Sequence, residues 1–428
     1  RHLPVLVVGG GPAGLAAAAT AASHGLRVAL VDQQASAGGQ VWRPDVRAGQ
    51  PRGVRRRLQH SAIDWYGEAR IVHAEPGFVW LEQPSGPVEL RAEQIVLATG
   101  ARELLLPFPG WMLPGVLGAG GAQALAKQGW DVRGKRVVVA GSGPLLLAAA
   151  ATLRRHGAHV LDILENSPRP ELARFAGGLW RWPGKAVDAA GLMLSLLGVP
   201  YRCGHRVVSA LGEHQLEAIE VDGPSGPRRI ACDLVAVGYG LVPNVELAQA
   251  LGCRLTPAGA HPRIAVDDEL RTSVPGVFAA GEACGIGGRE CALIEGELAG
   301  HLAAGARAAA LKLMSRRRHA RAFAAWLQAH FRPGPEVHSL GTPDTCLCRC
   351  EDVSLARIQA CGSLREARLQ TRCGMGVCQG RVCGTALQAL GLFGNEAATA
   401  ALRPPLVPAR LETLAALSLP DSQAEETP

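Results

Sequence analysis

The chain has 428 residues, of which 48% are hydrophobic and 19% charged, and its formal net charge is +7. This length is too great for one ordinary core and predicts two or three domains. The basic residues are spread out and lack an aromatic or motif context, which argues against nucleic-acid binding. The longest apolar run, residues 144–153, is far short of the ~20 residues that a membrane helix needs. We therefore expect no transmembrane segment and a cytoplasmic protein, with peripheral docking on a membrane partner left open.

The chain begins with the pattern of a dinucleotide-binding unit. An apolar strand at residues 5–8 leads into GGGPAG at residues 9–14, an alanine-rich helix and a second strand that ends at Asp32. In such a unit Gly9 permits the tight turn, Gly11 lets the backbone approach a pyrophosphate, and Gly14 lets the helix pack close to the sheet. The positive end of the helix would face the phosphates, and Asp32 would accept hydrogen bonds from ribose hydroxyls.

Two later segments indicate that this dinucleotide is FAD. Residues 95–100 read IVLATG, and residues 272–281 read TSVPGVFAAG and precede Glu282. Here the chain resembles the two-dinucleotide-binding-domain flavoproteins, in which an NAD-type domain splits the FAD domain. The resemblance implies that the first segment crosses between the domains and that the second brings Glu282, usually Asp in that superfamily, to the ribityl and pyrophosphate groups. The cofactor-binding residues predicted for this site are Gly9, Gly11, Pro12, Ala13, Gly14, Asp32, Gln33, Gly39, Gln40, Ala98, Thr99, Gly100, Gly281 and Glu282.

A second unit of the same pattern lies in the middle of the chain. A strand at residues 136–140 enters GSGPLL at residues 141–146, followed by an alanine-rich helix and a strand that ends at Glu165. Leu146 replaces the third glycine, which would push the helix away from the sheet or force a different turn. Gly141, Gly143 and Glu165 are the candidate nucleotide contacts. Three options for this site stay open, namely NAD(H), another adenine nucleotide such as ATP, and no ligand.

The cysteines are unevenly placed. All twelve lie after residue 202, and seven lie between Cys346 and Cys383. A disulfide scaffold would need a secreted context, of which the sequence shows no sign. The clustering favours a metal or iron–sulfur site instead. Flavoprotein disulfide reductases of this architecture carry a redox-active cysteine pair earlier in the chain, and the absence of any cysteine before Cys203 excludes that chemistry.

Two short motifs supply the candidate metal ligands. Cys348 and Cys350 form a C-x-C pair, and Cys373 and Cys378 form a C-x4-C pair. Four thiolates are what a [2Fe–2S] cluster needs, so we predict these four as its ligands. A zinc site, for which C-x-C is unusually tight, and a relic without metal are the alternatives. Three cysteines of this region are not among the predicted ligands. Cys346, and above all Cys383, could replace one of the four. Cys361 is expected to be a buried apolar residue.

The motifs together resemble one family. They are CRCEDV at residues 348–353, TRCGMGVCQGRVC at 371–383, GGGPAG at 9–14 and LPFPGW at 106–111. In this combination the chain resembles, over essentially its whole length, the α-subunits of the opine oxidase, hydrogen cyanide synthase and D-hydroxyproline dehydrogenase family. The cysteine-rich module is also similar to the bacterioferritin-associated ferredoxin (BFD) domain.

The resemblance implies a division of labour between subunits. A β-subunit of the D-amino-acid-oxidase type would oxidise an amino or imino acid at its own FAD, and this chain would pass the electrons through FAD and [2Fe–2S] to a downstream acceptor. Further expected components are an FMN at the subunit interface and a small ferredoxin-like γ-subunit. No catalytic residue is expected in this chain, because its histidines fall singly with no acid at motif spacing. D-Hydroxyproline or an opine is favoured as substrate over glycine, and the alternatives are a self-contained NAD(P)H-dependent reductase and a non-catalytic assembly subunit.

The predicted fold is therefore an α/β flavoprotein whose FAD domain is split by an NAD-like Rossmann domain, with a small ferredoxin-like module at the C-terminal end. The predicted boundaries are 1–105 plus 230–305 for the FAD domain, 106–229 for the inserted domain, 306–339 for a helical connector, 340–395 for the [2Fe–2S] module and 396–428 for a tail.

Overall fold

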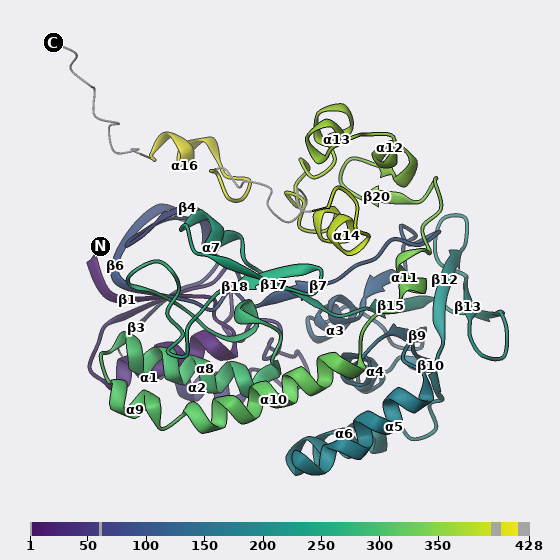
Figure 1. Cartoon of the computed structure of the whole chain (residues 1–428), viewed down its shortest axis with the longest axis horizontal. Coiled ribbons are helices and arrows are strands. Elements are labelled where there is room, and N and C mark those ends of the chain that lie inside the picture. Colours follow the sequence, from purple (N-terminus) through teal and green to yellow (C-terminus); the bar gives the residue numbers. More distant parts are fainter. Residues whose placement is uncertain (1, 60–61, 395–403, 418–428) are drawn as a thin grey trace.

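A computed structural model describes residues 2–59, 62–394 and 404–417 (Figure 1). Residue 395, with which the predicted module ends, and most of the predicted tail lie outside this part of the chain. The fold is α/β, with two separate sheets that are largely parallel and a small cysteine-rich module. Within the described residues, no helix combines the length and the apolar composition that crossing a bilayer requires.

The first sheet draws strands from both ends of the predicted FAD domain. Its strand order is β3-β2-β1-β6-β5-β4, and β19 pairs with β6. Val8 of β1 lies opposite Val31 of β2 and Leu97 of β6, and Ala279 of β19 lies opposite Leu97 in the same parallel sense. The segments that follow these four strands therefore meet at one edge of the sheet. The strands are β1 His2–Val8, β2 Val28–Val31, β3 Ile63–Tyr66, β4 Arg70–Glu75, β5 Phe78–Gln83, β6 Gly86–Leu97 and β19 Val277–Ala279.

Two helices pack closely against this sheet and against each other. They are α1 (Pro12–Ser23) and α8 (Gly288–Ala303). A Cβ atom added at Gly296 would lie 2.1 Å from the Ala13 carbonyl oxygen, and one at Gly300 would lie 2.5 Å from that of Ala17. Glycine on one helix facing alanine on the other thus permits backbone contact. The short α2 (Arg52–Leu58) lies beside them.

The second sheet is the core of the inserted domain, and it includes residues 234–238, which lie beyond the domain end predicted at residue 229. Its order is β11-β10-β9-β15-β8, and all of its pairs are parallel. These strands are β8 Val116–Gly118, β9 Arg136–Gly141, β10 His159–Glu165, β11 Tyr201–Cys203 and β15 Leu234–Gly238. The accompanying helices are α3 Ala119–Lys127, α4 Leu145–Arg155, α5 Arg169–Gly178, η1 Leu179–Arg181 and α6 Pro183–Ser195, and an antiparallel sheet comprises β12 Arg206–Leu211, β13 Ala218–Asp222 and β14 Arg228–Ala231.

The chain leaves and re-enters the first domain along two paired strands. β7 (Ala101–Glu103) and β16 (Leu241–Pro243) are antiparallel, with Arg102 opposite Val242. β7 begins directly after the ATG turn, so the junction lies next to the edge where the predicted FAD segments meet. The elements between β16 and α8 are α7 Glu246–Ala250, β17 Leu255–Ala258, β18 His261–Ile264, β19 and η2 Gly281–Cys284.

The connector extends along both nucleotide-binding parts. It contains α9 (Arg307–Leu311), α10 (Met314–His330) and α11 (Pro335–His338), and α10 runs from α8 toward α4 (Figure 1). The cysteine module then packs its own apolar core around buried residues such as Leu347, Ile358 and Ala367. Its elements are β20 Cys346–Cys348, β21 Val353–Ser354, α12 Leu355–Gln359, α13 Leu364–Thr371 and α14 Cys383–Ala389, and α16 Leu411–Ala415 follows near the C-terminal end.

Candidate cofactor sites

The turn at residues 9–14 contacts three of the other segments predicted to hold FAD. A Cβ atom at Gly9 would lie 2.2 Å from the Ala98 carbonyl oxygen. One at Gly39 would lie 2.8 Å from the Cα atom of Gly11, and one at Gly281 would lie 2.9 Å from the Cβ atom of Ala13. The structure thus brings together four predicted segments that are separated by up to 270 residues along the chain.

Gly14 and Asp32 shape this turn. A Cβ atom at Gly14 would lie 1.7 Å from the Gly9 carbonyl oxygen, so only glycine lets α1 start this close to β1. The Asp32 carboxylate accepts hydrogen bonds from the backbone N–H groups of Gly10, at 2.5 Å, and Gln34, at 2.7 Å. Burial raises the pKa of Asp32, and these two hydrogen bonds oppose that rise.

Two other predicted contacts have exposed side chains. Gln33 and Gln40 are both exposed, and the Gln40 Oε1 atom accepts a hydrogen bond from Arg43 at 2.7 Å. Gly100 has a φ of +71°, which a glycine adopts without strain at this crossing.

Glu282 has one carboxylate oxygen that is satisfied and one that is not. Its Oε1 atom accepts hydrogen bonds from the N–H groups of Gly288, at 2.7 Å, and Gly287, at 3.4 Å. Its Oε2 atom is buried and has no hydrogen-bond partner, and burial raises the pKa of the group. A buried acceptor without a donor fits a ligand that brings a hydroxyl group, as the ribityl chain and ribose of FAD do.

Glu295 supports the same segment and was not predicted from the sequence. It is fully buried, accepts a hydrogen bond from Gly281 N–H at 3.0 Å, and forms ion pairs with Arg317 at 2.9 Å and Arg321 at 2.6 Å. Arg321 also donates to the carbonyl of Gly285 at 2.6 Å. The four-residue spacing of the two arginines on α10 was the available signal, because it puts both side chains on one helix face.

In the second nucleotide-like unit, the helix begins one residue later relative to the glycine turn than in the first unit. α1 begins immediately after Gly11, whereas α4 begins at Leu145, two residues after Gly143. Leu146 is fully buried in the core of this domain, and Gly143 has a φ of +98° where Gly11 has −76°, so the two turns differ in backbone conformation. Glu165 is fully buried and accepts hydrogen bonds from Gly143 N–H at 2.9 Å and Ser167 N–H at 2.8 Å, although burial raises its pKa. The Gly143 N–H group, a candidate phosphate donor, is therefore already engaged.

The end of the connector lies over this second turn. A Cβ atom at Gly143 would lie 3.7 Å from that of Phe331, whose ring centroid is 4.8 Å from that of Phe175. The Ser167 hydroxyl donates to the carbonyl of His330 at 3.3 Å. Protein atoms thus cover the carboxyl ends of β9 and β10, where a dinucleotide would bind in this fold.

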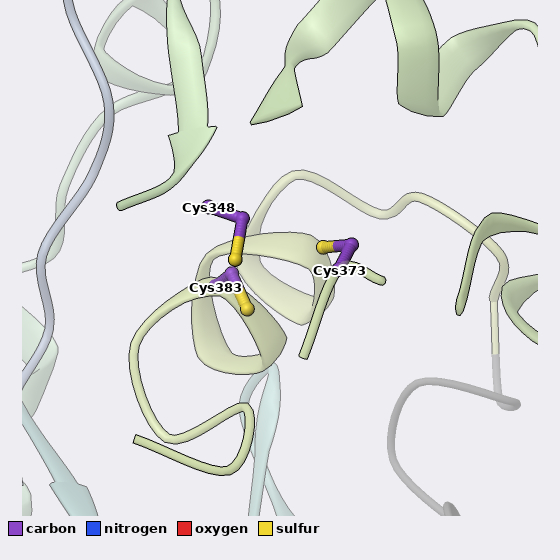
Figure 2. A group of neighbouring side chains, drawn as sticks. All are labelled: Cys348, Cys373 and Cys383. Carbon is purple, nitrogen blue, oxygen red and sulfur yellow. The ribbon is translucent and has the colours of Figure 1, made fainter. Parts of the chain in front are cut away.

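Five cysteines form the candidate metal centre. The sulfur atoms of Cys348, Cys373 and Cys383 lie within 4.8 Å of one another (Figure 2). The thiol of Cys378 interacts with those of Cys383 and Cys350. Hydrogen bonding from Cys383 lowers the pKa of Cys378 to about 4 and also lowers that of Cys373. The arrangement favours thiolates at those two positions, which is the ligand form for iron or zinc.

The cluster includes one cysteine outside the predicted four. Cys383, at the start of α14, contacts both Cys373 and Cys378, whereas Cys350 is exposed and contacts Cys378. The signal was present, because Cys373, Cys378 and Cys383 follow one another at the same C-x4-C spacing. Cys361 instead lies apart, with its thiol 3.4 Å from the carbonyl of Arg357.

A chain of hydrogen bonds connects the two candidate sites. Thr99 Oγ1 donates to the Asn244 carbonyl at 2.7 Å, and Asn244 Nδ2 donates to the Thr99 carbonyl at 2.9 Å. Arg102 donates to Asn244 Oδ1 at 2.8 Å and to the Arg381 carbonyl at 3.1 Å. Arg381 then donates to the Cys378 carbonyl at 3.3 Å. The predicted flavin crossing and the cysteine loop are thus held by one continuous network.

Comparison with known proteins identifies the family. A family model described as pyridine nucleotide-disulphide oxidoreductase matches residues 3–309. An opine oxidase subunit from Rhizobium meliloti (strain 1021) is 33% identical, over 97% of this chain and 99% of its own length. Hydrogen cyanide synthase subunit HcnB from Pseudomonas protegens is 31% identical, over 88% of this chain and 89% of its own. The chain belongs to the family of this opine oxidase subunit.

Membership in this family makes the chain a flavoprotein oxidoreductase subunit, which is what the sequence motifs predicted. L-Proline dehydrogenase from P. horikoshii has the same fold, with a TM-score of 0.69 at 20% identity over 97% of this chain and 79% of that one. The family of the matching model implies FAD, and the glycine contacts and the unpaired Glu282 oxygen described above fit that cofactor.

Proposed function

We propose that this chain is the electron-transferring subunit of a multi-subunit dehydrogenase that oxidises an amino or imino acid. The substrate would be oxidised in a partner subunit of the D-amino-acid-oxidase type. The observation that carries the proposal is the continuous network from Thr99 to Cys378, because it joins a predicted flavin segment to a cluster of thiols. The similarity to the opine oxidase subunit of Rhizobium meliloti supports it.

The chain's own residues would hold two redox groups. The turn at residues 9–14 and Glu282 would hold FAD, and four of the five clustered thiols would hold a [2Fe–2S] cluster. FAD accepts electron pairs and an iron–sulfur cluster passes electrons singly, so together they would convert a two-electron oxidation into single-electron output. The predicted ligand set Cys348, Cys350, Cys373 and Cys378 stays a prediction, with Cys383 as a further candidate.

The second nucleotide site supports electron entry from a partner subunit. The alternative, a self-contained NAD(P)H-dependent reductase, needs a free phosphate-binding turn. Glu165 engages the Gly143 N–H group, and Phe331 covers the turn. These contacts favour a second domain without bound NAD(H) or ATP.

The substrate and the other components are inferred from the relatives. D-Hydroxyproline or an opine is the favoured substrate class, and opine oxidase is the named activity of one relative. Cyanide formation from glycine is the second candidate, because hydrogen cyanide synthase subunit HcnB is similar to the chain over 89% of its own length. An FMN at the subunit interface and a ferredoxin-like γ-subunit would complete the complex.

The deciding experiment is spectroscopy of the purified chain. Ultraviolet–visible and EPR spectra would be recorded before and after dithionite reduction, with flavin, iron and zinc quantified. We expect flavin bands, about two irons per chain and an S = 1/2 signal after reduction. Flavin without iron, or zinc in place of iron, would contradict the relay and favour the self-contained reductase.

A further inference from the structure

α13 carries a row of basic side chains on its outer side. Arg365, Arg368 and Leu369 lie at spacings that place them along one face of α13, and Arg372 follows directly after the helix, with a φ of +61°. Arg365 and Arg372 are exposed, and the Leu369 side chain is 71% exposed. We call these four residues the basic stripe. In Figure 1, α13 lies on the side of the module that faces away from both sheets.

The basic stripe ends at the exposed part of the thiol cluster. Arg372 forms an ion pair with Glu351 at 2.8 Å, and Glu351 follows the exposed Cys350 in sequence. A Cβ atom at Gly374, the residue after Cys373, would lie 3.7 Å from Arg368 Nε. The stripe therefore leads to Glu351 and the exposed Cys350, whereas Cys348, Cys373 and Cys383 are buried beneath this surface.

Two large apolar side chains extend this surface beside Cys350. Met375 is 50% exposed and Val377 is 80% exposed. Their loop is held against Cys350, because a Cβ atom at Gly376 would lie 2.3 Å from the Cys350 Cβ atom. A group of exposed apolar side chains rimmed by charge is typical of a surface that binds another protein.

The charge of the module points to the nature of that protein. Residues 346–393 contain six arginines, three acidic residues and no lysine or histidine. Two of the acids have partners, since Glu351 pairs with Arg372 and Glu366 accepts hydrogen bonds from Gly362 and Gln370. The exposed surface is thus basic, and complementary charge favours an acidic partner.

We propose that the exit face, formed by the basic stripe with Met375 and Val377, binds a small acidic protein that carries one electron at a time. This inference rests on the proposed function and names the acceptor that the relay requires. In each encounter one electron leaves the reduced chain and reduces the oxidised centre of the carrier, with no bond made or broken and no proton moved. Two carriers are reduced for each two-electron oxidation of substrate.

The test compares acceptors of opposite charge. The purified chain with its cofactors would be photoreduced and mixed in a stopped-flow instrument with rubredoxin, which is acidic, with cytochrome c, which is basic, or with a neutral quinone. For the wild type, the rubredoxin rate constant should exceed that of cytochrome c and fall as ionic strength rises. The double variant Arg365→Glu/Leu369→Glu should lower the rubredoxin rate constant on the order of tenfold or more. Arg318→Glu reverses one charge at an exposed position on α10, as Arg365→Glu does on α13, and should have no effect.

The outcomes separate this inference from the proposed function. A chain without iron, or one whose reduced form does not reduce the neutral quinone, would contradict the relay itself. With iron, flavin and quinone reduction intact, equal rubredoxin rates in the double variant and the wild type would overturn the exit face. If the rate constant of the wild type with rubredoxin did not depend on ionic strength, that result would also contradict the exit face. Loss of co-purification with the substrate-oxidising subunit in the double variant would also overturn it, because the face would then be a subunit interface.

Discussion

Arg102 and Arg381 meet at the junction between the first domain and the cysteine module, where Arg102 Nε donates a hydrogen bond to the Arg381 carbonyl at 3.1 Å. Glu246 balances the charge of Arg102 at 2.7 Å, and the two side chains are 22% and 17% exposed. One mostly buried guanidinium therefore holds the cysteine loop, the Asn244 side chain and an acid together.

Replacing Arg102 with alanine should weaken this junction. The change leaves Glu246 mostly buried without a countercharge, which costs about 3 kcal/mol. The urea midpoint of unfolding, followed by tryptophan fluorescence, measures the loss. Arg91→Ala is the matched control, since it removes an exposed ion pair with Glu89 and should cost less than about 1 kcal/mol. Equal losses in both variants would contradict the role given to Arg102.

Cys383 should be needed for metal binding. Its thiol contacts those of Cys373 and Cys378, so Cys383→Ser should reduce the iron content of the purified chain as strongly as Cys378→Ser. Cys361→Ser is the control and should retain iron, because Cys361 lies apart from the cluster. Full iron content in Cys383→Ser would leave Cys348, Cys350, Cys373 and Cys378 as the ligands.

The Glu295 ion pairs should make stability depend on acid pH. Burial acts to raise the pKa of Glu295, but Arg321 and Arg317 hold it below its ordinary value. The stabilisation is therefore full above the unfolded pKa of about 4.3 and is lost as the pH falls through the lower folded pKa. Glu295→Gln should be less stable than the wild type by about 3 kcal/mol at neutral pH.

The pH series provides the check on this prediction. The difference in urea midpoint between Glu295→Gln and the wild type should shrink as the pH is lowered past the folded pKa, because the protonated wild type then resembles the variant. A difference that stays constant over the whole acid range would show that the effect of the substitution is not electrostatic.

NADH should not reduce the flavin of this chain. The Glu165 carboxylate accepts a hydrogen bond from the Gly143 N–H group, and Phe331 covers the turn where the pyrophosphate would lie. Mixing the anaerobic protein with a large excess of NADH should leave the flavin absorbance unchanged, while photoreduction of the same sample bleaches it. Bleaching by NADH alone, or saturable NADH binding in calorimetry, would refute the closed second site.

Much of the first site was predictable because its determinants are local. The glycine turn, the strands around it and the acid that follows repeat a short pattern, and β1, α1 and β2 form where that pattern places them. The replacement of a glycine by Leu146 predicted a displaced helix or a different turn, and the φ angles of Gly143 and Gly11 differ, at +98° and −76°. Family membership was likewise predicted from motifs and is confirmed by the comparisons.

Other features depend on residues that are far apart in sequence. Glu295 meets Arg321 only because α10 folds back over α8, and Phe331 reaches Gly143 only because the connector continues across the second domain. The buried His156 has an acidic partner, Asp45, 111 residues away, which no motif spacing could reveal. The inclusion of Cys383 in the thiol cluster similarly depends on where α14 begins relative to β20.

Residue types and their spacing thus decided which chemistry this chain can support, because turns, strands and thiol pairs are specified within a few residues. The packing of the connector and of the cysteine module decided which sites are connected and which are closed. Those outcomes depend on contacts between segments up to 279 residues apart, as between Arg102 and Arg381. A local pattern carries no information about such contacts, since their free energy arises only when the whole chain has packed.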